Sequence, residues 1–320
     1  MSERLPDGGH DESRWAGIAA RGWLTPKLYR PGSRPEAGVD VRSPIVLALL
    51  VALGSYAIAY LGVMLAADRI PESVFGIWNR WDAVHYMQIA RDGYSADPDH
   101  RFLIVWLPLY PWLVRALSTV IGDVHLAGLL VSLLSYVGAS VLLYRLVALD
   151  FPERVAIRTV LYLAIFPTAY FLHAAYTESL FLVLVFGSFY AARTERWALA
   201  GVLGALATLT RITAFGLIPA LLVEYMTQKR FRPSEFRLDA LYLALVPLGF
   251  GAYMVLNHVV LGDPLAFLEI AQDRHFKYLA PPWVGIERVW AAAMGSGPRW
   301  QIIRCGLTSA RATSSIAMAV

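Results

Sequence analysis

Two kinds of residue are scarce in this 320-residue chain: cysteine, which occurs once as Cys305, and charged residues, which make up 16% of the sequence. A single cysteine cannot form an internal disulfide, and it cannot supply a thiolate metal cluster. Soluble globular domains carry about a quarter charged residues. The sequence therefore excludes a disulfide-stabilised secreted domain, and its low charge argues against a soluble protein.

Signatures of nucleotide and metal chemistry are also missing. The sequence has no glycine-rich phosphate loop of the P-loop or Rossmann type, and no residues with the spacing of metal ligands. We therefore expect no cofactor and no metal. The formal net charge of +4 is modest. Because Lys and Arg gather in particular loops, we read them as determinants of membrane orientation and expect no nucleic-acid binding.

Apolar residues dominate what is present, at 57% of the chain. Several apolar runs approach or exceed the about 20 residues that cross a bilayer as a helix. The sequence therefore predicts an all-α polytopic membrane protein with about seven spans and additional interfacial helices. The expected spans are residues 44–67, 124–147, 155–172, 179–192, two short spans within 197–225, and 238–261.

The two ends of the chain differ from this apolar region, which covers residues 44–294. Residues 1–43 are polar and rich in Pro, Gly and Arg, so we expect a disordered, basic, cytoplasmic tail. Residues 295–320 contain no clear apolar span and form an atypical tail. The Arg- and Ala-rich composition favours a bacterial source, for which the membrane would be the plasma membrane.

One apolar stretch does not fit a simple span. Residues 102–121 contain Pro108, Pro111 and Arg115, which weaken a membrane helix. We predict an interfacial or re-entrant element here. If the stretch crossed the membrane, the basic residues 229–237 would lie outside, against the positive-inside rule.

Arg211 interrupts the long apolar run 197–225, which exceeds one untilted span. A hairpin near residues 210–213 would divide the run into two short spans and place Arg211 at the outer face. Arginine suits phosphate because its guanidinium is a planar fork of donors. The alternative is an arginine that snorkels or pairs helices.

Asp82 lies in a segment rich in aromatic and polar residues that follows the first span and so faces the extracytoplasmic side. A carboxylate there can accept a proton from an attacking hydroxyl, or it can cap the next helix. His85 and Tyr86 follow at i+3 and i+4 on the same helix face, and both are candidate substrate contacts. The rings can equally anchor the helix at the membrane interface, and His85 can be a structural hydrogen-bonding residue.

Two further polar groups are expected at this outer face. Glu178 begins an apolar helix, where the helix dipole favours an acid. With Tyr176 and Thr177 beside it, Glu178 also fits a sugar or phosphate site. His275 and Lys277 lie in the last outer loop, where a cationic pair can hold a phosphate or simply be solvated.

Four segments follow one another between residues 78 and 215: residues 81–86, 108–111, 176–181 and 206–211. Together they resemble the PIG-V family of GPI mannosyltransferase 2-like proteins. Two departures accompany the resemblance. Residues 105–107 read Val-Trp-Leu, where the family pattern has two phenylalanines. After Gly295 the family continues with further membrane helices, so we expect a C-terminally truncated or frameshifted chain.

The resemblance implies a GT-C-type helix bundle with a catalytic helix in the first extracytoplasmic loop. It implies inverting transfer of mannose from polyprenyl-phosphate mannose to a lipid-linked or cell-envelope acceptor, with Asp82 as general base. The leaving phosphate needs a cation such as Arg211, His275 or Lys277. The partners would be the lipid donor, the acceptor and membrane lipids.

Two other functions stay open on the sequence alone. The first is a GT-C enzyme that uses another polyprenyl-phosphate sugar, such as glucose or arabinose. The second is a transporter or flippase of lipid-linked sugars, which would show paired repeats and broken helices at mid-membrane. No repeat is evident, and the polar groups gather at one face, which favours an enzyme.

Overall fold

The computed structural model describes residues 42–65, 78–275, 283–284, 286–287 and 290. The tails expected at residues 1–41 and 295–320, and the expected site residue Lys277, lie outside this part of the chain. Phe267 ends the first of two compact units and Leu268 begins the second. The description below concerns the first unit, apart from the bounds of the last helix.

The described residues are built of helices and contain no strand, as the sequence predicts. In chain order, the elements are α2 (Arg42–Leu65), α3 (Asp82–Asp92), η2 (Arg101–Val105), α4 (Leu109–Ile121), α5 (Val124–Ala148), α6 (Glu153–Ile165), α7 (Tyr170–His173), α8 (Glu178–Arg193), α9 (Trp197–Thr208), η3 (Ile212–Gly216), α10 (Leu217–Gln228), η4 (Pro233–Glu235), η5 (Leu238–Ala244), α11 (Leu245–Leu261) and α12 (Ala266–His275).

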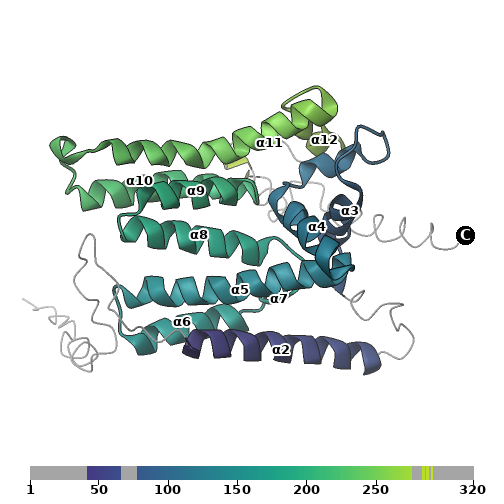
Figure 1. The fold of residues 1–320 in the computed structure, drawn as a ribbon, viewed down its shortest axis with the longest axis horizontal. Coiled ribbons are helices and arrows are strands. Elements are labelled where there is room, and N and C mark those ends of the chain that lie inside the picture. The colour runs from purple at the N-terminus through teal and green to yellow at the C-terminus, as the bar shows by residue number, and fades with distance from the viewer. Residues whose placement is uncertain (1–41, 66–77, 276–282, 285, 288–289, 291–320) are drawn as a thin grey trace, which may run out of the picture. The chain divides into compact units, whose positions relative to one another are not determined.

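The longer helices α2, α5, α6, α8, α9, α10 and α11 lie side by side in a bundle (Figure 1). Helix α8 packs against both α5 and α9, and α9 packs against α11. Helices α3 and α4 lie together at one end, where α5 and α8 begin. We call this end, formed by residues 78–123, 174–178 and 209–216, the α3 end. The opposite end, formed by residues 149–153, 193–197 and 229–237, is the α10 end.

A two-residue connection keeps α4 at the α3 end. Gly122 has φ 83°, in the left-handed region that favours glycine, and its N–H donates to the Ser118 carbonyl at 2.8 Å. Asp123 then caps α5, because its carboxylate accepts from the Leu126 N–H at 2.7 Å. Helix α4 has 13 residues, fewer than the about 20 that cross a bilayer. That it is an interfacial or re-entrant element stays a prediction.

The predicted hairpin between residues 197 and 225 is present. The Trp197 ring at the start of α9 lies 4.9 Å from the Tyr225 ring near the end of α10, so the two helices run in opposite directions. Arg211 lies in the turn between them, at the α3 end.

The span expected at residues 155–172 is wrong in its extent. Helix α6 ends at Ile165, and α7 forms a separate turn from Tyr170 to His173. The cause is Pro167, since a proline lacks the N–H of a continuing helix and disfavours helical dihedrals at the residue before it. Phe166 accordingly has ψ 141°, which is extended.

Small residues bring α9 and α11 close together. A Cβ added to Gly249 would collide with the Ala205 carbonyl, and one added to Gly201 would collide with the Tyr242 carbonyl. The Thr208 hydroxyl also donates to the Val246 carbonyl at 2.8 Å. Close backbone approach through small residues and hydroxyl hydrogen bonds is typical of helices packed inside a membrane.

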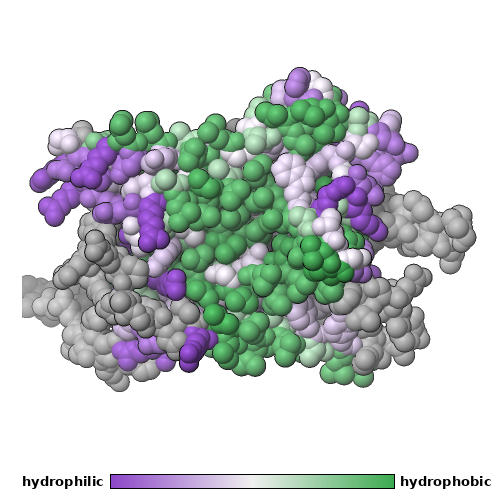
Figure 2. Space-filling view, viewed as in Figure 1, coloured by the Kyte–Doolittle hydropathy of each residue, from purple (hydrophilic) through white to green (hydrophobic). Residues whose placement is uncertain are grey.

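Two helices in the described residues are long and apolar enough to cross a membrane, Val124–Ala148 and Leu238–Leu261, the second joining η5 to α11. Shorter apolar helices lie at Arg42–Ile58, Leu109–Ile121, Trp197–Thr208 and Ile212–Gln228. Figure 2 shows apolar surface over the middle of the bundle and hydrophilic residues gathered toward the ends.

Candidate active site

Asp82 is the first residue of α3 and lies exposed at the α3 end. The N-cap position belongs to Trp81, which has φ 49° and an exposed side chain. The interpretation of Asp82 as an N-cap is therefore wrong. No described residue donates a hydrogen bond to the Asp82 carboxylate, so the acid is available for chemistry.

The sequence of α3 explains why Asp82 faces outward. The buried residues Ala83, Tyr86, Met87 and Ala90 follow helical spacing and form one apolar face. This face packs on α4 and α5, where the Met87 side chain lies against Gly128. The rest of the helix, including its first residue, is left at the surface.

Arg211 and Glu178 form an ion pair at the same end of the bundle. Arg211 Nη1 donates to Glu178 Oε1 at 2.6 Å and to Thr177 Oγ1 at 3.0 Å. The Arg211 and Glu178 side chains are 38% and 30% exposed. No described residue accepts from Nε or Nη2 of Arg211. One side of the guanidinium is therefore held by the protein, and the other is open to a ligand.

The buried Tyr86 side chain connects the two parts of this site. Burial raises the pKa of Tyr86, the charges of Asp82 and Glu178 raise it further, and Arg211 lowers it. The Tyr86 ring lies 6.4 Å from the Tyr176 ring, centroid to centroid, and Tyr176 directly precedes Thr177 and Glu178, which hold Arg211. The helix that begins with Asp82 therefore packs beside the residues that hold Arg211.

Tyr176 also ties the start of α8 to the start of α3. Its hydroxyl donates to the Arg80 carbonyl at 2.8 Å, and its ring is buried. The sequence places this tyrosine beside Glu178 but does not predict its contact with the Asp82 segment. The two residues bonded here are 96 positions apart, so no local pattern signals the contact.

His85 occupies a different environment from the charged groups. Its ring lies 4.2 Å from the Trp106 ring and 5.5 Å from the Phe102 ring, centroid to centroid. Trp106 is one of the residues that depart from the expected family pattern. The departure therefore falls on a residue that positions His85, and the structure assigns His85 to an aromatic cluster beside α3.

The remaining expected residues are not placed with this site. The structure describes His275 only as the last helical residue of α12, and Lys277 lies outside the described residues. In the described part of the chain, no group of three or more His, Cys, Asp or Glu residues forms a site for a metal ion.

Comparisons with known proteins identify a family for the chain. A family profile described as dolichyl-phosphate-mannose-protein mannosyltransferase matches residues 106–272, just over half of the chain. The chain is 34% identical over 142 residues to proteins named GPI mannosyltransferase 2 from two strains of Cryptococcus neoformans var. neoformans serotype D, JEC21 and B-3501A. These alignments cover 42% of this chain and 33% of each relative, so the chain spans about a third of the length of the curated relatives it matches. No solved structure matches the chain.

Proposed function

The chain belongs to the dolichyl-phosphate-mannose-protein mannosyltransferase family, a GT-C family, and from this premise we propose that it is a multi-pass membrane mannosyltransferase. It transfers mannose from polyprenyl-phosphate mannose to a lipid-linked or cell-envelope acceptor. The reaction takes place at the α3 end, on the extracytoplasmic side. The observation that carries the proposal is that the start of α3, with Asp82, is joined to the start of α8 by the bond from Tyr176 to the Arg80 carbonyl, where Glu178 pairs with Arg211.

The distribution of charge supports this orientation. Six basic residues lie at the α10 end, four of them within residues 229–237: Arg193, Arg196, Lys229, Arg230, Arg232 and Arg237. Five lie dispersed at the α3 end: Arg80, Arg91, Arg101, Arg115 and Arg211. The positive-inside rule places such a concentration on the cytoplasmic side. The α3 end, with its exposed acid, then faces outward, and the apolar surface between the two ends in Figure 2 contacts lipid.

Asp82 acts as the general base. Its carboxylate removes the proton from the acceptor hydroxyl while the hydroxyl oxygen attacks C1 of mannose. The bond between C1 and the phosphate oxygen breaks on the opposite face, which inverts the configuration at C1. The polyprenyl phosphate leaves with the bonding electrons, and the proton remains on Asp82 until water removes it.

Arg211 stabilises the departing phosphate. The leaving group gains negative charge in the transition state, and a cation fixed in advance beside it lowers the barrier. Glu178 and Thr177 are positioning residues, because their bonds to Nη1 leave Nε and Nη2 for the phosphate. No nucleotide takes part, since the donor is already a sugar phosphate ester.

The test measures transfer of radiolabelled mannose from polyprenyl-phosphate mannose into lipid and envelope fractions. We expect incorporation with wild type, and a loss of at least about 100-fold with Asp82→Asn, which keeps the side chain's size but cannot act as a base. Arg211→Ala should lose a similar factor. Asp92→Asn is the matched control, because Asp92 is an exposed acid at the other end of the same helix.

Two outcomes would overturn the proposal. Full activity of Asp82→Asn would show that Asp82 is not the general base. Wild-type incorporation from polyprenyl-phosphate glucose, with none from the mannose donor, would assign the enzyme to a different sugar.

A further inference from the structure

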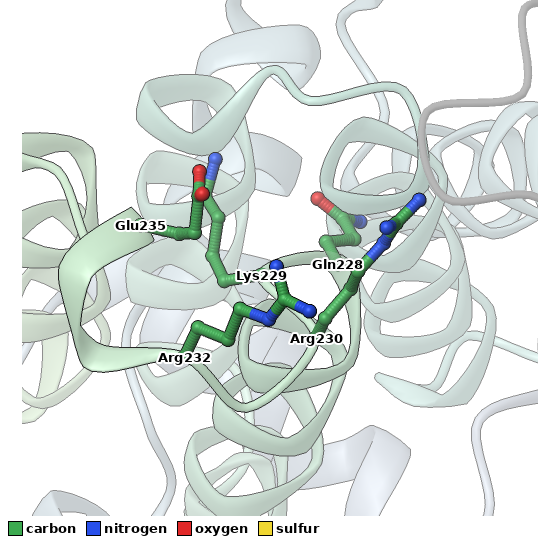
Figure 3. Close-up of a pocket in the computed structure, with 5 residues that line it drawn as sticks. All are labelled: Gln228, Lys229, Arg230, Arg232 and Glu235. Carbon is green, nitrogen blue, oxygen red and sulfur yellow. The ribbon is translucent and has the colours of Figure 1, made fainter.

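A second charged cluster lies at the α10 end, separate from the candidate active site. It is a pocket lined by Gln228, Lys229, Arg230, Arg232 and Glu235 (Figure 3). Three cations and one acid therefore surround the pocket. All five residues belong to the turn that leads from α10 into η4.

The backbone of this turn brings the cations together. Arg230 and Phe231 have φ 52° and 54°, in the left-handed region that residues other than glycine rarely occupy. The Phe231 N–H donates to the Met226 carbonyl at 2.8 Å, and the Arg232 N–H donates to the Lys229 carbonyl at 3.0 Å. These bonds fold the chain back on itself. Figure 3 shows the Arg230 side chain pointing the same way as Gln228, Lys229 pointing the same way as Glu235, and the Arg232 guanidinium between the two groups.

The two arginines of the pocket differ from a neighbouring arginine, Arg193, whose charge is balanced by two acids. Arg193 forms a paired contact with Asp150, at 2.8 and 2.7 Å, and a further contact with Glu224 at 3.4 Å. In contrast, no acid among the described residues forms an ion pair with the pocket residues Arg230 or Arg232. Arginines gathered in this way attract an anion, and their planar forks match a phosphate.

Exposed apolar side chains border the same turn. Phe231 is 60% exposed, Phe236 is 45% exposed and Leu238 is 83% exposed. Figure 2 shows hydrophilic residues of the α10 end meeting the apolar surface of the bundle. Aromatic and apolar groups beside cations suit the boundary between lipid headgroups and acyl chains. A site that binds free phosphate from water does not require neighbouring apolar side chains.

We propose that this pocket binds the headgroup phosphate of an acidic phospholipid in the membrane leaflet at the α10 end. Arg230, Arg232 and Lys229 hold the phosphate, and Phe231 and Phe236 contact the lipid chains. The site lies at the opposite end of the bundle from the sugar-transfer site, so its test does not require the proposed reaction.

The test measures lipid binding to the purified full chain by native mass spectrometry, with phosphatidylglycerol and phosphatidylcholine as probes. Phosphatidylglycerol should bind more tightly. Arg232→Gln should weaken that binding about fivefold, the contribution of one basic residue near an anionic lipid surface. Arg196→Gln is the matched control, because Arg196 is exposed at the same end and does not line the pocket. It should leave the affinity unchanged.

Three results would overturn the proposal. Equal binding of the two lipids would exclude an acidic headgroup. Equal losses from Arg232→Gln and Arg196→Gln would indicate general attraction to positive charge. Complete competition by inorganic phosphate at matched concentration would indicate a site for a free anion. Lys229→Gln repeats the test at a second pocket residue, and each variant's elution and thermal midpoint are compared with wild type to verify folding.

Discussion

The guanidinium of Arg211 donates to the protein from one nitrogen, Nη1, and its other two nitrogens have no acceptor among the described residues. Nη1 is committed to Glu178 and Thr177, at 2.6 and 3.0 Å. Arginine has five N–H donors in a rigid plane, so fixing one edge also fixes the direction of the others. In the proposed reaction, Glu178 would therefore set the direction in which Arg211 binds a phosphate, without contacting that phosphate itself.

Glu178→Gln tests this role, because it keeps the size of the side chain and removes its charge. A hydrogen bond to a charged group contributes roughly 1.5–3 kcal/mol. Part of that loss should appear as weaker donor binding, so we expect the KM for the mannose donor to rise about tenfold. The measurement is the initial rate of transfer against donor concentration.

Glu195→Gln is the control for this experiment, since Glu195 is an exposed acid at the α10 end. It should change neither kcat nor the donor KM. An unchanged donor KM in Glu178→Gln would show that Glu178 has no positioning role toward Arg211.

The sequence proposes the residues of the candidate site one by one, and it does not predict how they pair. Asp82 and Arg211 stood out because a carboxylate and an arginine are unexpected beside long apolar runs. The ion pair joins residues 33 positions apart, and it forms only because the α9–α10 hairpin returns Arg211 to the start of α8. The packing of His85 against Trp106 is likewise a tertiary contact without a local pattern.

Among the elements, the contact between α9 and α11 depends most strongly on residue size. Gly249 faces the Ala205 carbonyl of α9 so closely that a methyl group cannot fit without backbone movement. Gly251 lies two residues further along α11, and a Cβ there would meet no atom within 4 Å. One helix therefore offers both a test substitution and its control.

Gly249→Ala should destabilise the protein by about 1–3 kcal/mol, the usual effect of overpacking a core. Gly251→Ala should be neutral or stabilise it by up to about 1 kcal/mol, because alanine is the better helix former. The measurement is the thermal unfolding midpoint in one detergent for wild type and both variants. Equal midpoints for the two variants would contradict the close contact.

Element boundaries were predictable where charge and length acted together. The length of residues 197–225 and the basic residues beyond them required a hairpin, and the structure has one. The break between α6 and α7 was missed because residues 155–172 are mostly apolar, with Arg158 as their one charged residue. Hydropathy averaged over such a run does not register the backbone effect of one proline, Pro167.

At the scale of the whole molecule, the two ends of the bundle differ in charge. The α10 end carries Lys229, Arg230 and Arg232 in one turn, whereas at the α3 end exposed arginines (Arg80, Arg91, Arg101, Arg115) are interspersed with exposed acids (Asp82, Asp92, Asp97, Asp99). In a membrane, this asymmetry would fix which end faces the cytoplasm. The proposed orientation therefore rests on charge, and it can be measured without any knowledge of the reaction.

The single native cysteine makes that measurement simple. In a Cys305→Ser background, a membrane-impermeant maleimide should label Asp97→Cys in intact cells. It should label Arg196→Cys only after lysis, because Arg196 lies at the α10 end. Labelling of Arg196→Cys alone in intact cells would place the candidate active site on the cytoplasmic side.

The glycine contacts of α9 have a consequence for the thermodynamics of substrate binding. Close contacts at Gly201 and Gly249 pack α9 against the η5–α11 segment. Arg211 follows the end of α9 by three residues. The backbone that carries Arg211 is thus held by helix packing, and Glu178 and Thr177 hold one nitrogen of its guanidinium. Little rotational freedom of this side chain remains to be lost on binding, so more of the contact energy can appear as affinity.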